Sequence, residues 1–259
     1  MSIASYIDHT ILKPTVTYIE IKKICEEALL YRFAAVCVPP PVIAKAREYL
    51  AAGQPATPAS KLSGPSTPSP PVSASVSSSA PAPVKIATVI GFPFGYSVLE
   101  AKLAEAEMAA ALADELDVVI SLVALRNGDW SYLEKEMQAI TDRAHVRGRT
   151  VKTIIESGIL TDKEIVRCCE IYGRVGVDFV KTSTGYAEKG ASVHAVELMR
   201  QHLPPSIQIK ASGGIRSYTF ARQLIDAGAD RLGCSASVAI VQEEEGLEKN
   251  GGEKSGGGY

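Results

Sequence analysis

Short apolar runs alternate with longer amphipathic segments along most of the chain. The runs are rich in Val and Ile, and several are apolar at consecutive positions rather than at every second one. Such runs are typical of strands that are buried on both faces of a parallel sheet. We predict eight strands, around 6–10 and at Ala34–Val38, Lys85–Phe92, Leu116–Leu122, Thr150–Glu156, Asp178–Ser183, Ile207–Ser212 and Arg231–Ser235.

The segments between these strands carry apolar residues at helical spacing. Thr161 followed by Glu164 also has the capping-box form, which predicts the start of a helix. Eight strands, each followed by a helix, favour a (β/α)8 barrel over a doubly wound sheet, which normally has fewer strands and a glycine-rich turn after its first strand. Helices are predicted at 97–116, 129–145, 161–172, 192–202 and 217–227.

One stretch breaks this pattern. Gly53–Pro83 holds eight of the fifteen prolines, nine serines, one charged residue and no aromatic residue. Such a composition cannot bury enough apolar surface to offset the ordering of its backbone, so a disordered insertion is predicted. We favour a surface loop over a linker between two domains, because the pattern after it continues the pattern before it. The expected organisation is one barrel over 1–245, interrupted at 53–83, and a flexible glycine-rich tail over 246–259.

Composition and charge exclude several classes of protein. The chain has 259 residues, of which 46% are apolar and 22% charged, as in ordinary globular enzymes. The net charge of −2 argues against a nucleic-acid or anionic-membrane binder, and no apolar run is long enough to span a bilayer. The N-terminus lacks the apolar core of a signal peptide. Five cysteines without ligand spacing indicate neither a disulfide framework nor a zinc site. A cytoplasmic protein is predicted.

Three lysines lie inside predicted strands. Lys152, Lys181 and Lys210 are 29 residues apart both times, which is the length of one strand–helix unit. We therefore expect them at equivalent levels of three successive strands, with their amines close together inside the barrel. Crowding and partial desolvation would lower the pKa of one amine and make it a nucleophile that forms a Schiff base with a carbonyl. The alternative is that the lysines reach outward to solvent or pair with helix carboxylates.

Small residues follow the last strands. The turns KTSTG (181–185), KASGGIR (210–216) and GCSAS (233–237) place glycines and hydroxyls where backbone amides can point at an anion. In such barrels the loops after the seventh and eighth strands frequently form a phosphate site with a helix N-terminus. A phosphate-binding site is therefore predicted at these turns, although glycines after strands often serve only as turn formers.

Two carboxylates accompany the lysines. Asp117 lies inside an apolar run, so we expect it to be paired with one of the lysines or bonded to water. Glu156 lies on the same strand face as Lys152 and is expected to pair with it. An ordinary buried ion pair is the alternative for both. The four histidines do not cluster with carboxylates at ligand spacing, so no metal and no cofactor are expected.

The stretches IDHTILKP, ADELDVVISL, FVKTSTG and KASGGIR occur in this order through the chain. Together they resemble the deoxyribose-phosphate aldolases, which are class I, Schiff-base aldolases built on a (β/α)8 barrel. The resemblance covers everything except the insertion and the tail. It implies reversible cleavage of 2-deoxy-D-ribose 5-phosphate into acetaldehyde and D-glyceraldehyde 3-phosphate, without a metal.

The resemblance also implies roles for individual residues. Lys181 would form the Schiff base, Lys210 would lower its pKa and take part in proton transfer, and Asp117 would act as acid and base through a water. The remaining residues implied to bind substrate or phosphate, or to lie close to the site, are Asp8, Thr10, Cys37, Thr184, Gly185, Gly213, Gly214 and Ser235. The turn GCSAS departs from the usual GTSSG, and Ala236 removes a hydroxyl donor.

Two other functions remain open at this stage. The same barrel could be a phosphosugar isomerase with Asp117 as its base, or a non-catalytic phosphometabolite-binding protein. The expected partner is a small phosphosugar, with neither nucleic acid nor membrane. The sequence leaves the oligomeric state open, with a homodimer among the options.

Overall fold

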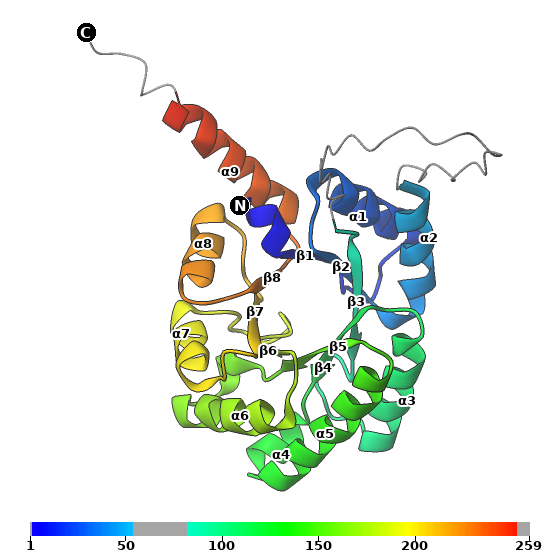
Figure 1. The fold of residues 1–259 in the computed structure, drawn as a ribbon, viewed down its shortest axis with the longest axis vertical. Coiled ribbons are helices and arrows are strands. Elements are labelled where there is room, and N and C mark those ends of the chain that lie inside the picture. Colours follow the sequence, from blue (N-terminus) through cyan, green and yellow to red (C-terminus); the bar gives the residue numbers. More distant parts are fainter. Residues whose placement is uncertain (1, 54–81, 253–259) are drawn as a thin grey trace, which may run out of the picture.

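The computed structural model describes residues 2–53 and 82–252, in which eight parallel strands close into a barrel (Figure 1). Each strand pairs with the next along the chain, and β8 pairs with β1. Helices surround the barrel and cover its outer face (Figure 1). The predicted (β/α)8 barrel is therefore confirmed. The strands are β1 Ile7–Thr10, β2 Ala35–Val38, β3 Lys85–Ile90, β4 Glu115–Val119, β5 Thr150–Ile154, β6 Phe179–Lys181, β7 Gln208–Ser212 and β8 Arg231–Cys234.

Six of the helices in the described residues, α1 and α4 to α8, begin after a residue whose side chain caps them. Thr17 and Thr161 each form a complete capping box, with Glu20 and Glu164 respectively, as was predicted for the second pair. The helices are α1 Tyr18–Tyr31, α2 Ile43–Gly53, α3 Leu99–Ala110, α4 Leu122–Arg126, α5 Trp130–Val146, α6 Asp162–Val175, α7 Val193–His202, α8 Tyr218–Asp226 and α9 Ser237–Gly252, with short 3-10 helices η1 Ile3–Tyr6, η2 Pro40–Val42 and η3 Ser157–Ile159.

Several segments differ from the sequence-based prediction. The helix predicted at 97–116 ends at Ala110, and β3, β5 and β6 each end two residues before their predicted ends. β4 ends at Val119, and Leu122, predicted as its last residue, begins α4 because the Ser121 side chain accepts a hydrogen bond from the Ala124 amide and caps a helix there. The predicted tail from Gly246 is helical up to Gly252, as part of α9. The rest of that tail and residues 54–81 of the predicted insertion lie outside the described residues.

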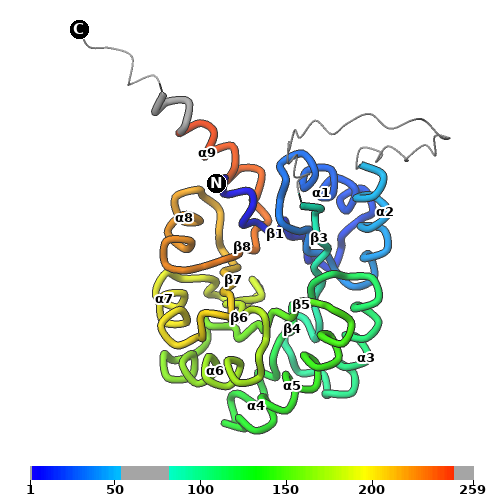
Figure 2. The backbone as a smooth tube through the Cα atoms, in the orientation of Figure 1, coloured from blue at the N-terminus to red at the C-terminus, as the bar shows by residue number. Residues whose placement is uncertain are grey.

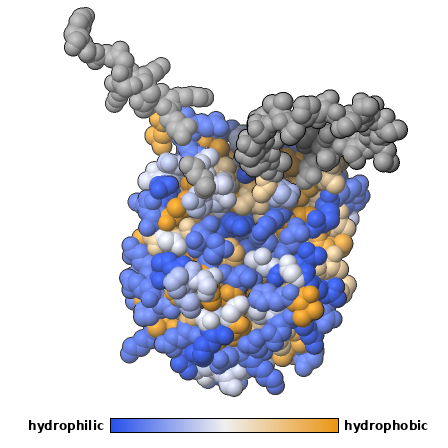
Figure 3. Space-filling view, viewed as in Figure 1, coloured by the Kyte–Doolittle hydropathy of each residue, from blue (hydrophilic) through white to orange (hydrophobic). Residues whose placement is uncertain are grey.

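The apolar core lies between the barrel and its helices. Strand alternation sends one set of side chains, such as Leu116 and Val118 of β4, outward into this core, whereas Asp117 between them faces the barrel interior. The outer surface shown in Figure 3 is mostly hydrophilic, with scattered apolar side chains. None of the helices in the described stretches is long and apolar enough to cross a membrane.

Hydrogen bonds join η1, before the first strand, to α9, after the last strand. The tube in Figure 2 shows η1 next to the beginning of α9. The Ile3 amide donates to the Glu244 carboxylate at 3.0 Å, and the Ser2 hydroxyl donates to the same group at 2.7 Å. Because α9 follows directly on β8, these bonds fix the helix that starts beside the mouth of the barrel.

The three strand lysines do not share one level. Lys181 of β6 lies beside Lys210 of β7, but Lys152 of β5 lies beside Phe179, two residues before Lys181. The prediction of equivalent levels is therefore correct for two lysines and wrong for Lys152. In a closed barrel the strands are staggered, so equal spacing along the sequence does not give equal height inside it.

Candidate active site

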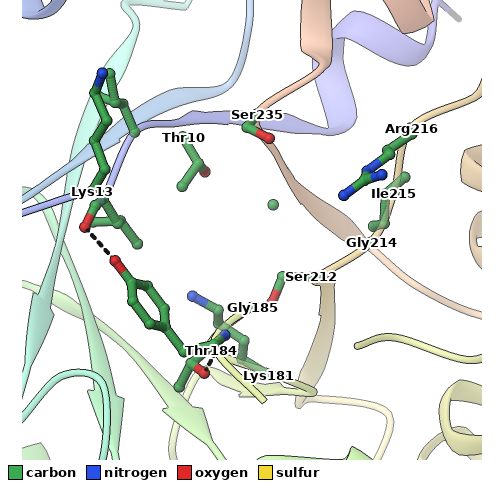
Figure 4. A pocket seen from close by; sticks show the side chains of 15 residues that line it. Thr10, Lys13, Lys181, Thr184, Gly185, Ser212, Gly214, Ile215, Arg216 and Ser235 are labelled. Carbon is green, nitrogen blue, oxygen red and sulfur yellow. Dashed lines mark hydrogen bonds between the residues drawn. The ribbon is translucent and has the colours of Figure 1, made fainter. Parts of the chain in front are cut away.

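A pocket opens at the carboxyl ends of the strands. It has a volume of about 340 Å³, and its walls come from the loops after β1, β6, β7 and β8. Figure 4 shows Lys181, Thr184 and Gly185 on one side of this pocket, with Thr10 and Ser235 on the opposite side. The lining residues are Thr10, Ile11, Leu12, Lys13, Lys181, Thr184, Gly185, Tyr186, Ser212, Gly213, Gly214, Ile215, Arg216, Gly233 and Ser235.

Lys181 forms part of the floor of this pocket. Its side chain is only 3% exposed, because β6 ends at this residue and holds it inside the barrel mouth. Lys152 and Lys210 are fully buried and do not line the pocket. Of the three strand lysines, Lys181 is therefore the one that a small molecule in the pocket can reach.

Asp117 connects all three lysines. Its Oδ2 accepts hydrogen bonds from Lys181 Nζ at 2.8 Å and from Lys210 Nζ at 2.7 Å, and its Oδ1 accepts one from Lys152 Nζ at 2.8 Å. The prediction that Asp117 pairs with a strand lysine is thus confirmed. One buried carboxylate from β4 fixes the positions of amines from β5, β6 and β7.

A second group of charges lies deeper in the barrel. Asp8 of β1 accepts from Lys210 and, through its other oxygen, from Arg231 at 2.6 Å. Glu115 of β4 pairs with Lys152 and lies 3.4 Å from Arg231. Together with the contacts of Asp117, they join side chains of six strands, β1 and β4 to β8, into a single network beneath the pocket.

The network alters the pKa values of its lysines in opposite directions. Complete burial lowers the pKa of Lys181, the Asp117 carboxylate opposes this effect, and the Lys210 ammonium adds to it. Burial acts on Lys210 too, but Asp117 and Asp8 together raise its pKa above the ordinary value. The predicted lowered pKa of Lys181 therefore arises mainly from desolvation, and the neighbouring lysine contributes less than expected.

The network holds more basic side chains than acidic ones. Asp8, Glu115 and Asp117 supply three negative charges, and burial raises the pKa of each less than the adjacent cations lower it. Lys152, Lys181, Lys210 and Arg231 would supply four positive charges, and the half-exposed Lys85 lies 3.1 Å from Glu115, so full ionisation leaves an excess of positive charge. Because uncompensated buried charge is costly, this imbalance favours a neutral Lys181.

Most of the predicted phosphate-binding residues do line the pocket. Gly213 and Gly214 follow β7, and both have left-handed backbone angles, with φ of 89° and 78°. Ser235 lies just before α9, whose first-turn amides and helix dipole favour an anion. Thr184 and Gly185 contribute from the β6 loop, and Thr10 lies at the end of β1.

Two residues implied by the resemblance do not reach the pocket. Asp8 is fully buried and bonded to Lys210 and Arg231. Cys37 is fully buried in a small apolar cluster with Ala87, and burial raises the pKa of its thiol. Both side chains face the barrel interior below its mouth, so neither can contact a phosphate in the pocket.

The expected pair of Glu156 with Lys152 does not form. Lys152 points to Asp117 and Glu115, which lie on the neighbouring strand β4. Glu156 follows the end of β5, where the backbone turns into a left-handed conformation with φ of 55°, and its carboxylate accepts from Thr184 instead. The pair was predicted from the alternation of side chains along β5, but this strand ends before Glu156.

Sequence reasoning missed Arg231 and Glu115. Glu115 is the first residue of β4 and lies on the same face as Asp117, two residues later. Arg231 is the first residue of β8 and lies on the same face as Gly233. Because side chains alternate along a strand, the interior position of Asp117 could have identified Glu115. No such signal marked Arg231, because the residue two positions later on β8 is a glycine. Lys13, Tyr186 and Arg216 also line the pocket and were not singled out.

A closed barrel of parallel strands with a pocket at their carboxyl ends defines an enzyme of the (β/α)8 class. The model of one family, described as DeoC/LacD family aldolase, matches residues 2–243. The chain belongs to this family.

Similar proteins carry consistent names. A deoxyribose-phosphate aldolase from Thermococcus gammatolerans is 42% identical over 249 residues, which cover 96% of this chain and 99% of that protein. A deoxyribose-phosphate aldolase from Caldicellulosiruptor saccharolyticus is 41% identical over 244 residues, or 93% of this chain and 98% of the relative.

Solved structures agree with the sequence comparisons. A putative deoxyribose-phosphate aldolase from Coccidioides immitis is 34% identical, with a TM-score of 0.79, and the match covers 94% of this chain and 85% of the other. A deoxyribose phosphate aldolase from Aeropyrum pernix, described as having a unique tetrameric structure, is 30% identical with a TM-score of 0.76, covering 95% and 92% of the two chains.

Proposed function

We propose that this protein reversibly cleaves 2-deoxy-D-ribose 5-phosphate into acetaldehyde and D-glyceraldehyde 3-phosphate through a Schiff base on Lys181. One observation carries the assignment of the nucleophile. Among the three strand lysines, Lys181 alone lines the pocket, and it is also the one whose pKa is lowered by its surroundings. A neutral amine at the floor of an anion-binding pocket is suited to attack the aldehyde of a phosphosugar.

The reaction proceeds in balanced steps. The Lys181 amine adds to C1 of the open-chain sugar, and the carbinolamine loses water to give an iminium ion. Removal of the proton on the C3 hydroxyl then breaks the C2–C3 bond, which releases D-glyceraldehyde 3-phosphate and leaves an enamine. Protonation at C2 and hydrolysis release acetaldehyde and restore the amine.

Lys210 and Asp117 are suited to the proton transfers. Both lysines share Oδ2 of Asp117, so this carboxylate can exchange protons between them and a water at the reacting carbon. Because the pKa of Lys210 is raised, it remains an ammonium that stabilises negative charge developing beside Lys181. The phosphate would be held by the amides of Gly213, Gly214 and the start of α9.

Reductive trapping tests this function. Borohydride added during turnover should leave an ethyl group on Lys181, identified by peptide mapping, while a coupled dehydrogenase assay records acetaldehyde release. The Lys181→Ala variant should lose both signals, with at least a thousandfold lower turnover, roughly the contribution of a covalent nucleophile. Lys163→Ala, which changes an exposed lysine of α6, is the matched control.

The two other candidate functions give different results. A phosphosugar isomerase would form an isomeric sugar phosphate without a reducible imine. A non-catalytic binding protein would gain thermal stability with phosphosugar but would show no turnover. Retention of full aldolase activity in Lys181→Ala would contradict the proposal.

For the assembly we propose a homodimer. An apolar groove between α2 and α3 exposes Met108 to 77% and Leu112 to 43%, with Pro40 and Pro41 beside them. A second copy of the chain would cover such side chains. Light scattering should give the mass of a dimer, and Met108→Asp should reduce it towards that of the monomer. A monomeric or tetrameric wild-type protein would contradict this proposal.

The cytoplasmic location stays a prediction from the sequence.

A further inference from the structure

Glu156 has a left-handed backbone conformation, although it is not a glycine and does not end a helix. Among the described residues, only Glu156 and Arg32 are non-glycine residues with a positive φ. Arg32 ends α1 as an ordinary left-handed cap, whereas Glu156 lies between β5 and η3. Such conformations persist in non-glycine residues when the surroundings impose them, and they concentrate at functional sites.

The surroundings that hold Glu156 belong to the loop after β6. Its carboxylate accepts from the Thr184 amide at 3.2 Å and from the Thr184 hydroxyl at 2.5 Å. The same hydroxyl accepts from the Tyr186 amide at 3.0 Å. The adjacent Ser157 amide donates to the Thr182 carbonyl at 2.7 Å. The Glu156 carboxylate thereby holds Thr184 directly, and the adjacent contacts of Ser157 and of the Thr184 hydroxyl hold Thr182 and Tyr186.

The carboxylate forms no ion pair with another described residue, and it is only 2% exposed. Burial raises its pKa, while the hydrogen bonds from Thr184 and the more distant charge of Lys181 lower it by less. A buried acid without a salt bridge is retained only at a cost. The hydrogen bonds from Thr184 are therefore the contacts that stabilise the buried Glu156 carboxylate.

The loop held in this way is one wall of the pocket. Thr184, Gly185 and Tyr186 all line it, and Thr184 and Gly185 lie opposite Ser235 (Figure 4). A Cβ atom added at Gly185 would lie 3.9 Å from the Gly213 Cα, so the loops after β6 and β7 meet at this point. Movement of Thr184 would consequently change the distance between the two loops that face an anion.

We propose that Glu156 is a positioning residue that sets the phosphate-binding geometry of the pocket through Thr184, without touching the reacting atoms. This inference rests on the proposed aldolase function. It assigns Glu156 to recognition of the phosphate group and not to the chemistry at Lys181. Loss of Glu156 should therefore affect phosphorylated substrates and spare their unphosphorylated counterparts.

The test compares 2-deoxyribose 5-phosphate with 2-deoxyribose in the same variants. In Glu156→Ala, KM for the phosphorylated sugar should rise about tenfold while kcat stays within about threefold, the pattern of lost substrate binding. The kcat/KM for 2-deoxyribose should remain within about twofold. Glu156→Gln, which keeps an acceptor oxygen, should lose less than Glu156→Ala.

Glu164 offers a matched control. It accepts from the amide of Thr161 at 2.7 Å and from its hydroxyl at 2.8 Å, as Glu156 does from Thr184, but it lies at the start of α6 outside the pocket lining. Glu164→Ala should leave the KM for both sugars unchanged. Equal losses with both sugars in Glu156→Ala, or no loss with either, would overturn the proposal.

Folding and the proposed function are checked separately. Borohydride trapping of acetaldehyde on Lys181 needs no phosphate, so a folded Glu156→Ala protein should still be labelled. An unlabelled variant would show that Glu156 supports the whole site and would overturn a role limited to phosphate. An unlabelled wild-type protein would instead refute the Schiff-base function.

Discussion

Lys181 and Lys210 donate to the same oxygen, Oδ2 of Asp117, at 2.8 and 2.7 Å. They are neighbours across β6 and β7, yet only Lys181 lines the pocket. The shared acceptor holds the charged amine of Lys210 next to the Lys181 amine at the floor of the pocket. Complete burial and the adjacent ammonium lower the pKa of Lys181, whereas two carboxylates keep Lys210 charged.

Lys210→Met should raise the pKa of Lys181. The Lys210 ammonium is one of the groups that lower this pKa, and its removal also leaves Asp117 free to favour protonated Lys181. The acidic limb of kcat/KM against pH should move to higher pH, and kcat should fall because a proton donor is lost. Lys163→Met, on the exposed surface of α6, should leave the limb in place. A limb that moves to lower pH would refute the assigned influence of Lys210.

Asp117→Asn should destabilise the protein and lower the pKa of Lys181 further. Asp117 is fully buried and accepts from three lysines, so its neutralisation leaves buried ammonium groups without their main partner. Loss of one member of a buried ion pair costs about 3–5 kcal/mol of unfolding free energy. Urea denaturation measures this loss. Asp162→Asn, at an exposed pair with His194, should have almost no effect.

The free energy of unfolding should decrease in acid. Burial raises the pKa values of Asp8 and Asp117, but the adjacent lysines, and for Asp8 also Arg231, lower both to below the ordinary value. Because the native carboxylates bind protons more weakly than the unfolded ones, their stabilisation is present above about pH 4, the unfolded pKa. It is lost as the pH falls from there towards the native pKa values.

Denaturation curves at several pH values below 5 test this dependence. Each of the two groups should contribute a slope of about 1.4 kcal/mol per pH unit. Asp117→Asn should show a shallower decrease than the wild type. An unchanged stability between pH 5 and pH 3 would contradict the assigned carboxylate network.

Gly190→Ala should weaken phosphate binding. A Cβ atom at this position would lie 2.2 Å from the Gly213 carbonyl oxygen, so the loop after β6 would have to separate from the loop after β7. We expect KM for the phosphorylated sugar to rise by about tenfold or more. The control is Gly246→Ala in α9, where the added Cβ meets nothing within 4 Å and alanine should add about 0.5–1 kcal/mol of stability. Unchanged kinetics in Gly190→Ala would show that the two loops can separate freely.

The local pattern of the sequence determined the elements and much of the candidate site. Consecutive apolar residues predicted the parallel strands, and the spacing of Lys181 and Lys210 placed their amines side by side. Small residues after the last strands identified the loops that line the pocket. These predictions succeeded because the alternation within a strand and the chemistry of a turn are set by neighbouring residues.

Only the tertiary structure decided how the charges are grouped. The stagger of the closed barrel placed Lys152 below Lys181, and its closure brought Arg231 of β8 to Asp8 of β1, 223 residues away in sequence. The turn after β5 directed Glu156 to Thr184 instead of Lys152. The height of a side chain inside a barrel, and the side chain that it contacts, depend on the stagger accumulated over all the strands. No single segment of the sequence encodes this stagger.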